Sequence, residues 1–235
     1  MASPMIPIFI NVFERLTYTR ILVERLHELG VDERLVLIDN GSTYEPLRDW
    51  LAGCGYPVIR LEENLGPYVG DILRISGELY KYASVRANEH IAYTDPDVVP
   101  CAECPPDFLE VWRTLLDSTP NIAQVGFALR IDDLPDAYPL KQRVIDVESI
   151  FWQSATNTST SNMAIYHSAI DTTFALVRAE NSFGFHENSL RTGPPYWARH
   201  MTWYETPCTL FDDIDHYRMR IADNDISWWS KYKFY

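Results

Sequence analysis

The alternation of short apolar runs with amphipathic segments is the feature that most restricts the fold of this chain. Residues 7–13, 35–38, 56–61 and 89–94 are apolar runs of strand length. Helical spacing of apolar residues follows at 18–29, 47–51 and 69–83. Strands that alternate with helices predict an α/β fold with a mainly parallel, Rossmann-like sheet flanked by helices. Such sheets bind ligands at the carboxyl ends of their strands.

The order of elements becomes less regular after residue 105. We expect a helix over 106–116, strands at 122–129 and 173–177, and a loop rich in proline and aspartate at 132–138. Residues 154–162 are small and polar, which fits an active-site flap or a disordered loop equally well. No repeat or linker divides the chain, so a single domain over 1–235 is expected.

The net charge of -13 restricts the partners of this chain. It opposes binding to a nucleic acid polymer, whose binders gather Lys and Arg on one face. It also repels a nucleotide diphosphate, so an enzyme that uses one would need a cation between its carboxylates and the ligand. No apolar run approaches the roughly 18 residues of a membrane span, and the first residues do not read as a signal peptide. We therefore expect no transmembrane segment and a cytoplasmic protein.

The four cysteines agree with a reducing compartment, because they are too few for a disulfide scaffold in a chain of 235 residues. Cys101 and Cys104 have the spacing of a redox pair or of half a zinc site. No second pair completes a zinc site, and prolines follow at once. Ordinary loop cysteines are the preferred interpretation.

Asp95 and Asp97 follow the apolar run 89–94 directly. Two carboxylates at the end of one strand can both address a hard cation such as Mg²⁺ or Mn²⁺, which takes its other ligands from phosphate and water. A capping or turn role is the common alternative for an isolated D-x-D motif. Further motifs along the chain favour the metal.

Four segments, at residues 8–12, 38–43, 63–67 and 93–98, occur in the order and spacing of a known family. Together they resemble the GT-A glycosyltransferases and, among these, the family 2-like enzymes. The resemblance covers roughly residues 6–100. It implies a GT-A fold in which residues 1–104 form the nucleotide-sugar-binding half, and residues 105–235 a smaller, mixed acceptor-binding half.

The resemblance implies a nucleotide-sugar donor, with UDP favoured as the commonest donor nucleotide of such enzymes. Asp97 would bind Mn²⁺ or Mg²⁺ directly, Asp95 would meet the ribose or a metal-bound water, and His200 would be the third metal ligand. The alternative for His200 is a packed or surface histidine, and that for Arg74 is a solvated helix arginine. Asp39 could instead be a helix N-cap or a turn residue. The remaining nucleotide-binding candidates are Phe9, Asn11, Asp39, Asn64, Gly66 and Arg74.

An inverting transferase needs a carboxylate to take the proton from the acceptor hydroxyl. Asp171 is the first candidate and Glu187 the second, and an N-cap or loop role is the alternative for either. The Glu-Asp pair typical of the family is absent from residues 185–189, which leaves the base open and a retaining mechanism possible. Glycan acceptors are held by aromatic faces and polar groups. The candidates are Trp152, Trp197, Trp203 and Tyr204, together with Glu148 on a common helix face with Trp152. The tryptophans could equally be core residues.

The function predicted from these motifs is that of a metal-dependent hexosyltransferase acting on a hydroxyl of a glycan acceptor, with cell-surface or capsular glycan synthesis as the expected setting. Two alternatives remain. A nucleotidyltransferase would carry a Gly-rich, lysine-bearing loop after the first strand, which residues 13–16 lack. A non-catalytic nucleotide-sugar-binding module with a degenerate GT-A fold would explain the missing Glu-Asp pair.

Overall fold

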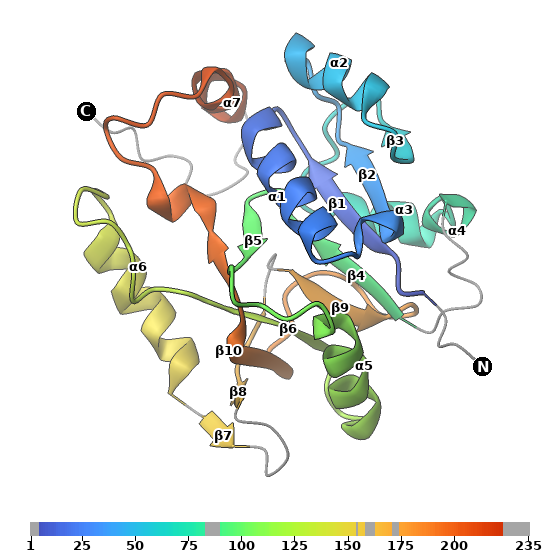
Figure 1. The fold of residues 1–235 in the computed structure, drawn as a ribbon. Helices are drawn as coiled ribbons and strands as arrows, with labels where there is room; N and C mark the ends of the chain where they lie inside the picture. Colours follow the sequence, from blue (N-terminus) through green and yellow to red (C-terminus); the bar gives the residue numbers. More distant parts are fainter. Residues whose placement is uncertain (1–4, 83–89, 154, 158–162, 171–173, 223–235) are drawn as a thin grey trace.

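A computed structural model describes residues 5–82, 90–153, 155–157, 163–170 and 174–222 (Figure 1). Ten strands form one sheet in the order β3-β2-β1-β4-β9-β6-β10-β8-β7, with β5 paired to β10. The strands are β1 (Ile8–Val12), β2 (Leu35–Asp39), β3 (Val58–Arg60), β4 (His90–Thr94), β5 (Val98–Pro100), β6 (Gln124–Leu129), β7 (Ala155–Asn157), β8 (Ala164–His167), β9 (Ala175–Arg178) and β10 (Ser189–His200). The α-helices are α1 (Leu16–Glu28), α2 (Glu45–Gly53), α3 (Val69–Ile75), α4 (Leu79–Tyr82), α5 (Phe108–Ser118), α6 (Lys141–Glu148) and α7 (Asp212–Ala222).

The first half of the sheet is parallel. Strands β3, β2, β1 and β4 pair in parallel, and every residue of β2 and β4 is buried. The second half is mixed, because β9 runs antiparallel to both β4 and β6, whereas β6 and β10 are parallel. This arrangement confirms the predicted GT-A-like α/β fold with a mixed C-terminal region. The assignment of donor and acceptor functions to the two halves stays a prediction.

The expected helix over residues 69–83 is two helices, which corrects the sequence prediction. Gly77 has a φ of 79°, and this left-handed conformation ends α3. The Glu78 amide donates to the Leu73 carbonyl at 2.9 Å, which closes the helix end. Helix α4 begins two residues after Gly77. Within the polar segment 154–162 the structure describes β7, so a strand stands where a flap or a loop was expected, and the remainder lies outside the described residues.

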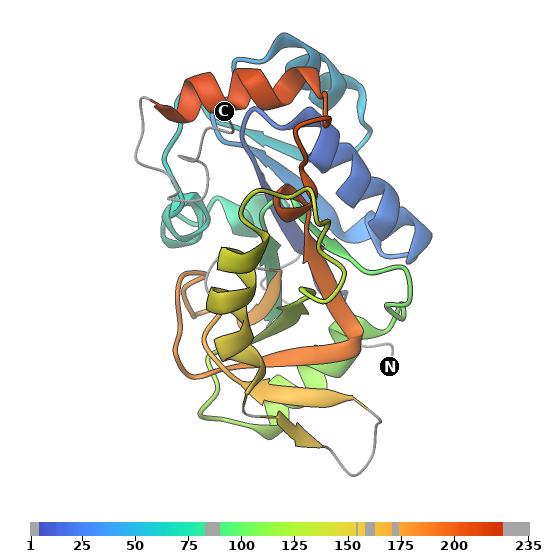
Figure 2. The ribbon, with the colours of Figure 1, turned by 90° about the vertical axis from the view of Figure 1, so that its left-hand side faces the viewer.

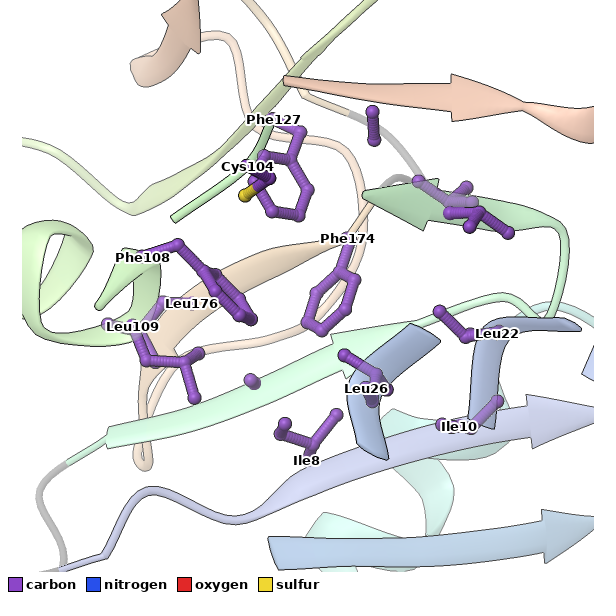
Figure 3. Close-up of a cluster of buried hydrophobic side chains, with 14 of the residues drawn as sticks. Ile8, Ile10, Leu22, Leu26, Cys104, Phe108, Leu109, Phe127, Phe174 and Leu176 are labelled. Carbon is purple, nitrogen blue, oxygen red and sulfur yellow. The ribbon is translucent and has the colours of Figure 1, made fainter. Parts of the chain in front are cut away.

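Two hydrophobic clusters cover the two faces of the sheet. Successive side chains of β1 point to opposite faces, so they enter the two clusters alternately. Ile8 and Ile10 meet Leu22 and Leu26 of α1 in the larger cluster (Figure 3). The same cluster contains the interlocked rings of α5, β6 and the start of β9, namely Phe108, Trp112, Phe127 and Phe174. Phe9 faces the other way, into the smaller cluster under α3.

The chain returns to the first half of the sheet after β10. A single 3₁₀ turn (Met201–Tyr204) follows β10, and α7 then lies across the top of the molecule, beside α2 and the start of α1 (Figures 1 and 2). The Asp213 carboxylate fixes α7 to α1, since it accepts hydrogen bonds from the Thr17 amide at 2.7 Å and the Thr17 hydroxyl at 2.8 Å. Among the described residues, no helix is long and apolar enough to cross a membrane.

Candidate active site

The carboxyl ends of β1, β2 and β4 form one edge of the sheet and carry the polar side chains named by the sequence. Val12 lies opposite Asp39, and Ile10 lies opposite Thr94, so the three strands end side by side. The Asn11 amide nitrogen donates to the Asp95 carboxylate at 3.3 Å across the two strand ends. The fold therefore gathers Asn11, Asp39, Asp95 and Asp97 at the edge where parallel sheets bind ligands.

Asp97 is nearly buried, with 9% of its surface exposed. Strand β5 begins at the next residue and pairs with the end of β10, which places His200 opposite Val98. The Met201 amide donates to the Asp97 carbonyl at 2.7 Å. His200 Nε2 then faces Asp97 Oδ1 at 3.9 Å. A residue 103 positions later in the sequence thus lies beside the D-x-D motif.

The ring of His200 is held on its other side. Nδ1 shares a hydrogen bond with the Thr202 hydroxyl at 2.6 Å, and the ring stacks on Trp203 with centroids 4.8 Å apart. Histidines that bind metals commonly use one nitrogen as ligand while the other is fixed by a hydrogen bond. His200 fits that pattern, because Thr202 fixes Nδ1 and Nε2 faces Oδ1 of Asp97.

Within the described part of the chain, no group of three or more His, Cys, Asp and Glu side chains is arranged to hold a metal ion. A pair of protein ligands still suits Mg²⁺ or Mn²⁺ in a nucleotide site, where phosphate oxygens and water complete the coordination. Asp97, His200 and the neighbouring Asp95 fit such a cation by donor type. Their roles as ligands stay predictions.

Arg15 is a site residue that the sequence analysis missed. Its Nη1 lies 3.1 Å from Asp97 Oδ2, and it is 9% exposed. The guanidinium also sits over the ring of Tyr217 in α7, 3.9 Å from the centroid. Burial by itself lowers the pKa of Arg15, but attraction to Tyr217 and Asp97 outweighs it and raises that pKa. The available signal was its place directly after the first strand.

Tyr18, one turn along α1 from Arg15, is held by the segment that follows β10. Its hydroxyl donates to the Glu205 carboxylate at 2.7 Å. Burial, together with the charge and hydrogen bond of Glu205, raises the pKa of Tyr18 far above its ordinary value. The phenol therefore stays protonated and keeps donating at any physiological pH.

Glu14 was also missed, and it joins three segments. Its side chain is fully buried, and its φ of 58° is in the left-handed region. The carboxylate accepts hydrogen bonds from the Thr43 amide at 2.9 Å and the Tyr44 amide at 2.7 Å, at the start of α2. His216 and Arg220 of α7 approach it within 3.3 and 3.4 Å. Glu14 therefore fixes the two residues before α2 and anchors α7 beside the site.

The turns after β2 and β3 are tied together. Asp39 Oδ1 accepts from the Ser42 amide at 3.0 Å, which gives Asp39 the turn role that was its alternative. Asn40 accepts from the Leu65 amide at 2.9 Å and donates to the Gly66 carbonyl at 3.1 Å. Asn64 accepts from the Gly66 amide at 2.8 Å. The predicted nucleotide-facing turns therefore form one rigid unit, and binding of a base by Asp39, Asn64 and Gly66 stays a prediction.

Gly41→Ala should push apart the turn after β2 and the turn after β3. A Cβ at Gly41 would lie 2.4 Å from the backbone carbon of Glu63, at a φ of 75°. The expected loss of unfolding free energy is about 2–5 kcal/mol, from the left-handed penalty plus overpacking. Gly55→Ala is the matched control, because Gly55 has a φ of 80° but no neighbour within 4 Å. Urea unfolding measures both, and equal losses would show that the close contact with Glu63 has no effect.

Two nucleotide-binding candidates lie elsewhere, which corrects the sequence analysis. Phe9 comes two residues before Asn11 on β1, so it lies farther from the carboxyl edge, under α3. It is fully buried in the smaller cluster. Arg74 pairs with Asp71 at 3.3 Å, and it donates to the Glu180 carbonyl at 3.1 Å, beyond the end of β9. That end of β9 lies at the amino edge, since Arg178 is opposite His90. Neither side chain is therefore in place to meet a nucleotide at the carboxyl edge.

The catalytic carboxylate is not assigned by the structure. Asp171 lies outside the described residues. Glu187 is exposed and precedes β10, whose first residue lies opposite the first residue of β6 at the amino edge. Strand β10 runs from this edge along β6, with a shift of register between Thr192 and Trp197, and ends at His200. This position corrects the choice of Glu187 as a base, because it is at the opposite edge from Asp97.

The predicted acceptor residues occupy two places. Trp152 and Trp197 contact each other, with centroids 6.0 Å apart, and the Arg130 guanidinium lies over the Trp197 ring at 4.4 Å. Trp203 stacks on His200, and the Tyr204 hydroxyl donates to Asp133. These four aromatic residues stay acceptor predictions.

The structure corrects the prediction for Glu148. It was expected on a common helix face with Trp152, lining a cleft. Its carboxylate is instead buried in an ion pair with Arg191, whose guanidinium lies over the ring of Phe151. A carboxylate paired in this way is already satisfied by the protein, so it is not available to bind an acceptor hydroxyl.

Cys101 and Cys104 are free, buried thiols in the loop after β5, as expected for loop cysteines. Burial raises the pKa of Cys101 to about 11 and that of Cys104 to about 12. A redox pair needs a lowered pKa, so this chemistry is disfavoured here.

The parallel half-sheet, its covering helices and the aspartate pair after β4 define a GT-A-like α/β fold. No family model and no curated protein matches the chain. Among solved structures it is similar to glucosyl-3-phosphoglycerate synthase from Mycobacterium tuberculosis in complex with Mn²⁺, UDP and glucosyl-3-phosphoglycerate, with 15% identity, a TM-score of 0.43, and coverage of 76% of this chain and 58% of that one. It is also similar to a cytidylyltransferase from Leptospira borgpetersenii, with 16% identity, a TM-score of 0.37, and coverage of 63% and 72%. The chain thus spans little more than half the length of the synthase.

Proposed function

We propose that this chain is a metal-dependent glycosyltransferase that moves a sugar from a nucleotide-diphosphate donor, with UDP favoured, to a hydroxyl of a glycan acceptor. The observation that carries the proposal is the convergence of Asn11, Asp95, Asp97 and His200 at the carboxyl edge of the parallel strands. Aspartates alone would repel a diphosphate, and the histidine beside them adds a donor type suited to a divalent cation.

We assign a role to each residue from its position in the fold. Asp97 and His200 would hold the cation, with Asp95 beside them. A bound Mn²⁺ or Mg²⁺ supplies positive charge to the departing diphosphate. Asp39 and the tied turns after β2 and β3 offer a rigid surface for the base of the nucleotide. Trp152, Trp197, Trp203 and Tyr204 would contact the acceptor, and Asp171 remains the candidate base of an inverting reaction. Without a base there, a retaining mechanism becomes possible.

The nucleotidyltransferase alternative is disfavoured by the loop after β1. A phosphate cradle needs exposed backbone amides, usually supplied by glycines. Here Glu14 turns its carboxylate inward to the start of α2, and its own amide donates to the Ser42 hydroxyl at 3.2 Å. The non-catalytic module is favoured by one observation, namely that Arg15 already pairs with Asp97.

Donor hydrolysis tests the proposal. The protein is incubated with a panel of nucleotide sugars, with and without Mn²⁺, and the products are separated by ion-exchange chromatography. We expect release of nucleoside diphosphate that requires Mn²⁺ and stops on addition of EDTA. Pyrophosphate release from a nucleoside triphosphate and a sugar phosphate would identify a nucleotidyltransferase. Binding of the nucleotide sugar without turnover of any donor or acceptor would identify the non-catalytic module.

A further inference from the structure

The Asp97 carboxylate faces two partners with its two oxygens. Oδ2 lies 3.1 Å from Nη1 of Arg15, and Oδ1 lies 3.9 Å from Nε2 of His200. The proposed function gives the same carboxylate to a divalent cation. A guanidinium and a metal ion would then contact one buried acidic group.

Arg15 is held in this position from α7. The ring of Tyr217 covers the guanidinium at 3.9 Å from its centroid, and the ring of Tyr18 lies at 5.2 Å. A cation over an aromatic face is attracted to it, and the attraction grows when water is excluded. Arg218 of α7 binds the Glu205 carboxylate at 3.2 Å, and Tyr18 donates to the same carboxylate. Helix α7 and Asp97 thus hold Arg15 between them.

We propose that Arg15 and a divalent cation share Asp97, and that Arg15, held by Tyr217, is a positioning residue that sets the affinity of the site for the cation. This inference rests on the proposed function, since metal binding at Asp97 is part of it. Two positive charges at one carboxylate repel each other, so Arg15 weakens cation binding. Linkage is reciprocal, so a bound cation in turn weakens the contact of Arg15 with Asp97. Arg15 is then held less firmly in place, and its contact with Tyr217 of α7 weakens as well.

The test measures Mn²⁺ binding directly, from the electron paramagnetic resonance signal of free Mn²⁺, with and without UDP. Arg15→Gln should bind Mn²⁺ at least about tenfold more tightly than the unchanged protein, because it removes a nearby positive charge. Arg15→Lys keeps the charge and should stay within about threefold. Arg20→Gln is the matched control, since Arg20 is an exposed arginine of the same helix. It should leave the affinity unchanged.

Tyr217→Leu keeps the charges of Arg15 and Asp97. It tests the inference independently if Arg15→Gln fails to fold. It should also tighten Mn²⁺ binding, by several-fold, because Arg15 is then less firmly held on Asp97. Hydrogen exchange gives a second readout. Mn²⁺ should speed amide exchange in α7 of the unchanged protein but not of Arg15→Gln.

Equal or weaker Mn²⁺ binding by Arg15→Gln or by Tyr217→Leu overturns the inference. The proposed function survives that result if the unchanged protein still releases nucleoside diphosphate with Mn²⁺. If none of the proteins binds Mn²⁺, the inference and the metal dependence fall together. Tighter binding by Arg15→Gln in a protein without transferase activity would support the shared carboxylate and contradict the proposed function.

Discussion

Asp97→Asn should reduce Mn²⁺-dependent release of nucleoside diphosphate by at least about 100-fold, which corresponds to about 2.7 kcal/mol of transition-state stabilisation. The amide keeps the size of the side chain and can still accept from Arg15, but it lacks the negative charge that a divalent cation requires. The loss is measured as a decrease in kcat/KM. Both proteins are assayed at the Mn²⁺ concentration that saturates the unchanged protein.

The control for this prediction separates chemistry from folding. Asp49 is an exposed aspartate of α2, and Asp49→Asn removes one carboxylate without touching the site. It should keep the full activity. Asp97→Asn also removes the carboxylate that pairs with the buried Arg15. The thermal unfolding of the variant is therefore recorded, and assays run well below its midpoint. Unchanged Mn²⁺-dependent turnover in the folded Asp97→Asn protein would show that Asp97 is not a metal ligand.

Glu14→Ala should produce the largest loss of stability among single substitutions near the site, about 3–5 kcal/mol. It removes a fully buried carboxylate from the Thr43 and Tyr44 amides at the start of α2, and Tyr44 itself provides no side-chain cap. It also leaves His216 and Arg220 of α7 without their acidic partner. Chemical unfolding followed by circular dichroism measures the loss.

Glu45→Ala is the matched control, since Glu45 is an exposed glutamate in the first turn of the same helix. It should cost less than about 1 kcal/mol, the usual size of a surface interaction with a helix terminus. Glu14→Gln keeps the shape of the side chain and should fall between the two. A loss at Glu14→Ala no greater than at Glu45→Ala would contradict the view that Glu14 joins α2 and α7.

Except for the break between α3 and α4 at Gly77, the main elements of the first half could be predicted, because each has a local sequence pattern. Strand β2 is a continuous apolar run, and α1 carries apolar residues at helical spacing. Asp95 and Asp97 could be placed because a parallel sheet brings its strand ends to one edge. The misplacement of Phe9 was avoidable, since two residues of strand separate it from Asn11 and carry it about 6.5 Å deeper into the core.

The rest of the site could not be predicted, because it is made by contacts between distant segments. Arg15 meets Asp97 and Tyr217, and Glu14 meets α2 and α7. No local period marks such contacts. Strand β10 escaped prediction because its sequence is interrupted by glycine and two prolines and shifts register along β6. His200 was proposed from the family resemblance, and the pairing of β5 with β10 brings it to Asp97.

The pairing of β5 with the end of β10 also sets the order in which the site can form during synthesis. The ribosome makes the chain from its N-terminus, and a domain folds as a unit once its segments are present. The strands up to β4 precede Asp97 in the chain, whereas His200 and Tyr217 emerge more than a hundred residues later. A nascent chain therefore lacks His200 beside Asp97 until β10 has been made, and it lacks Tyr217 over Arg15 until α7 has been made.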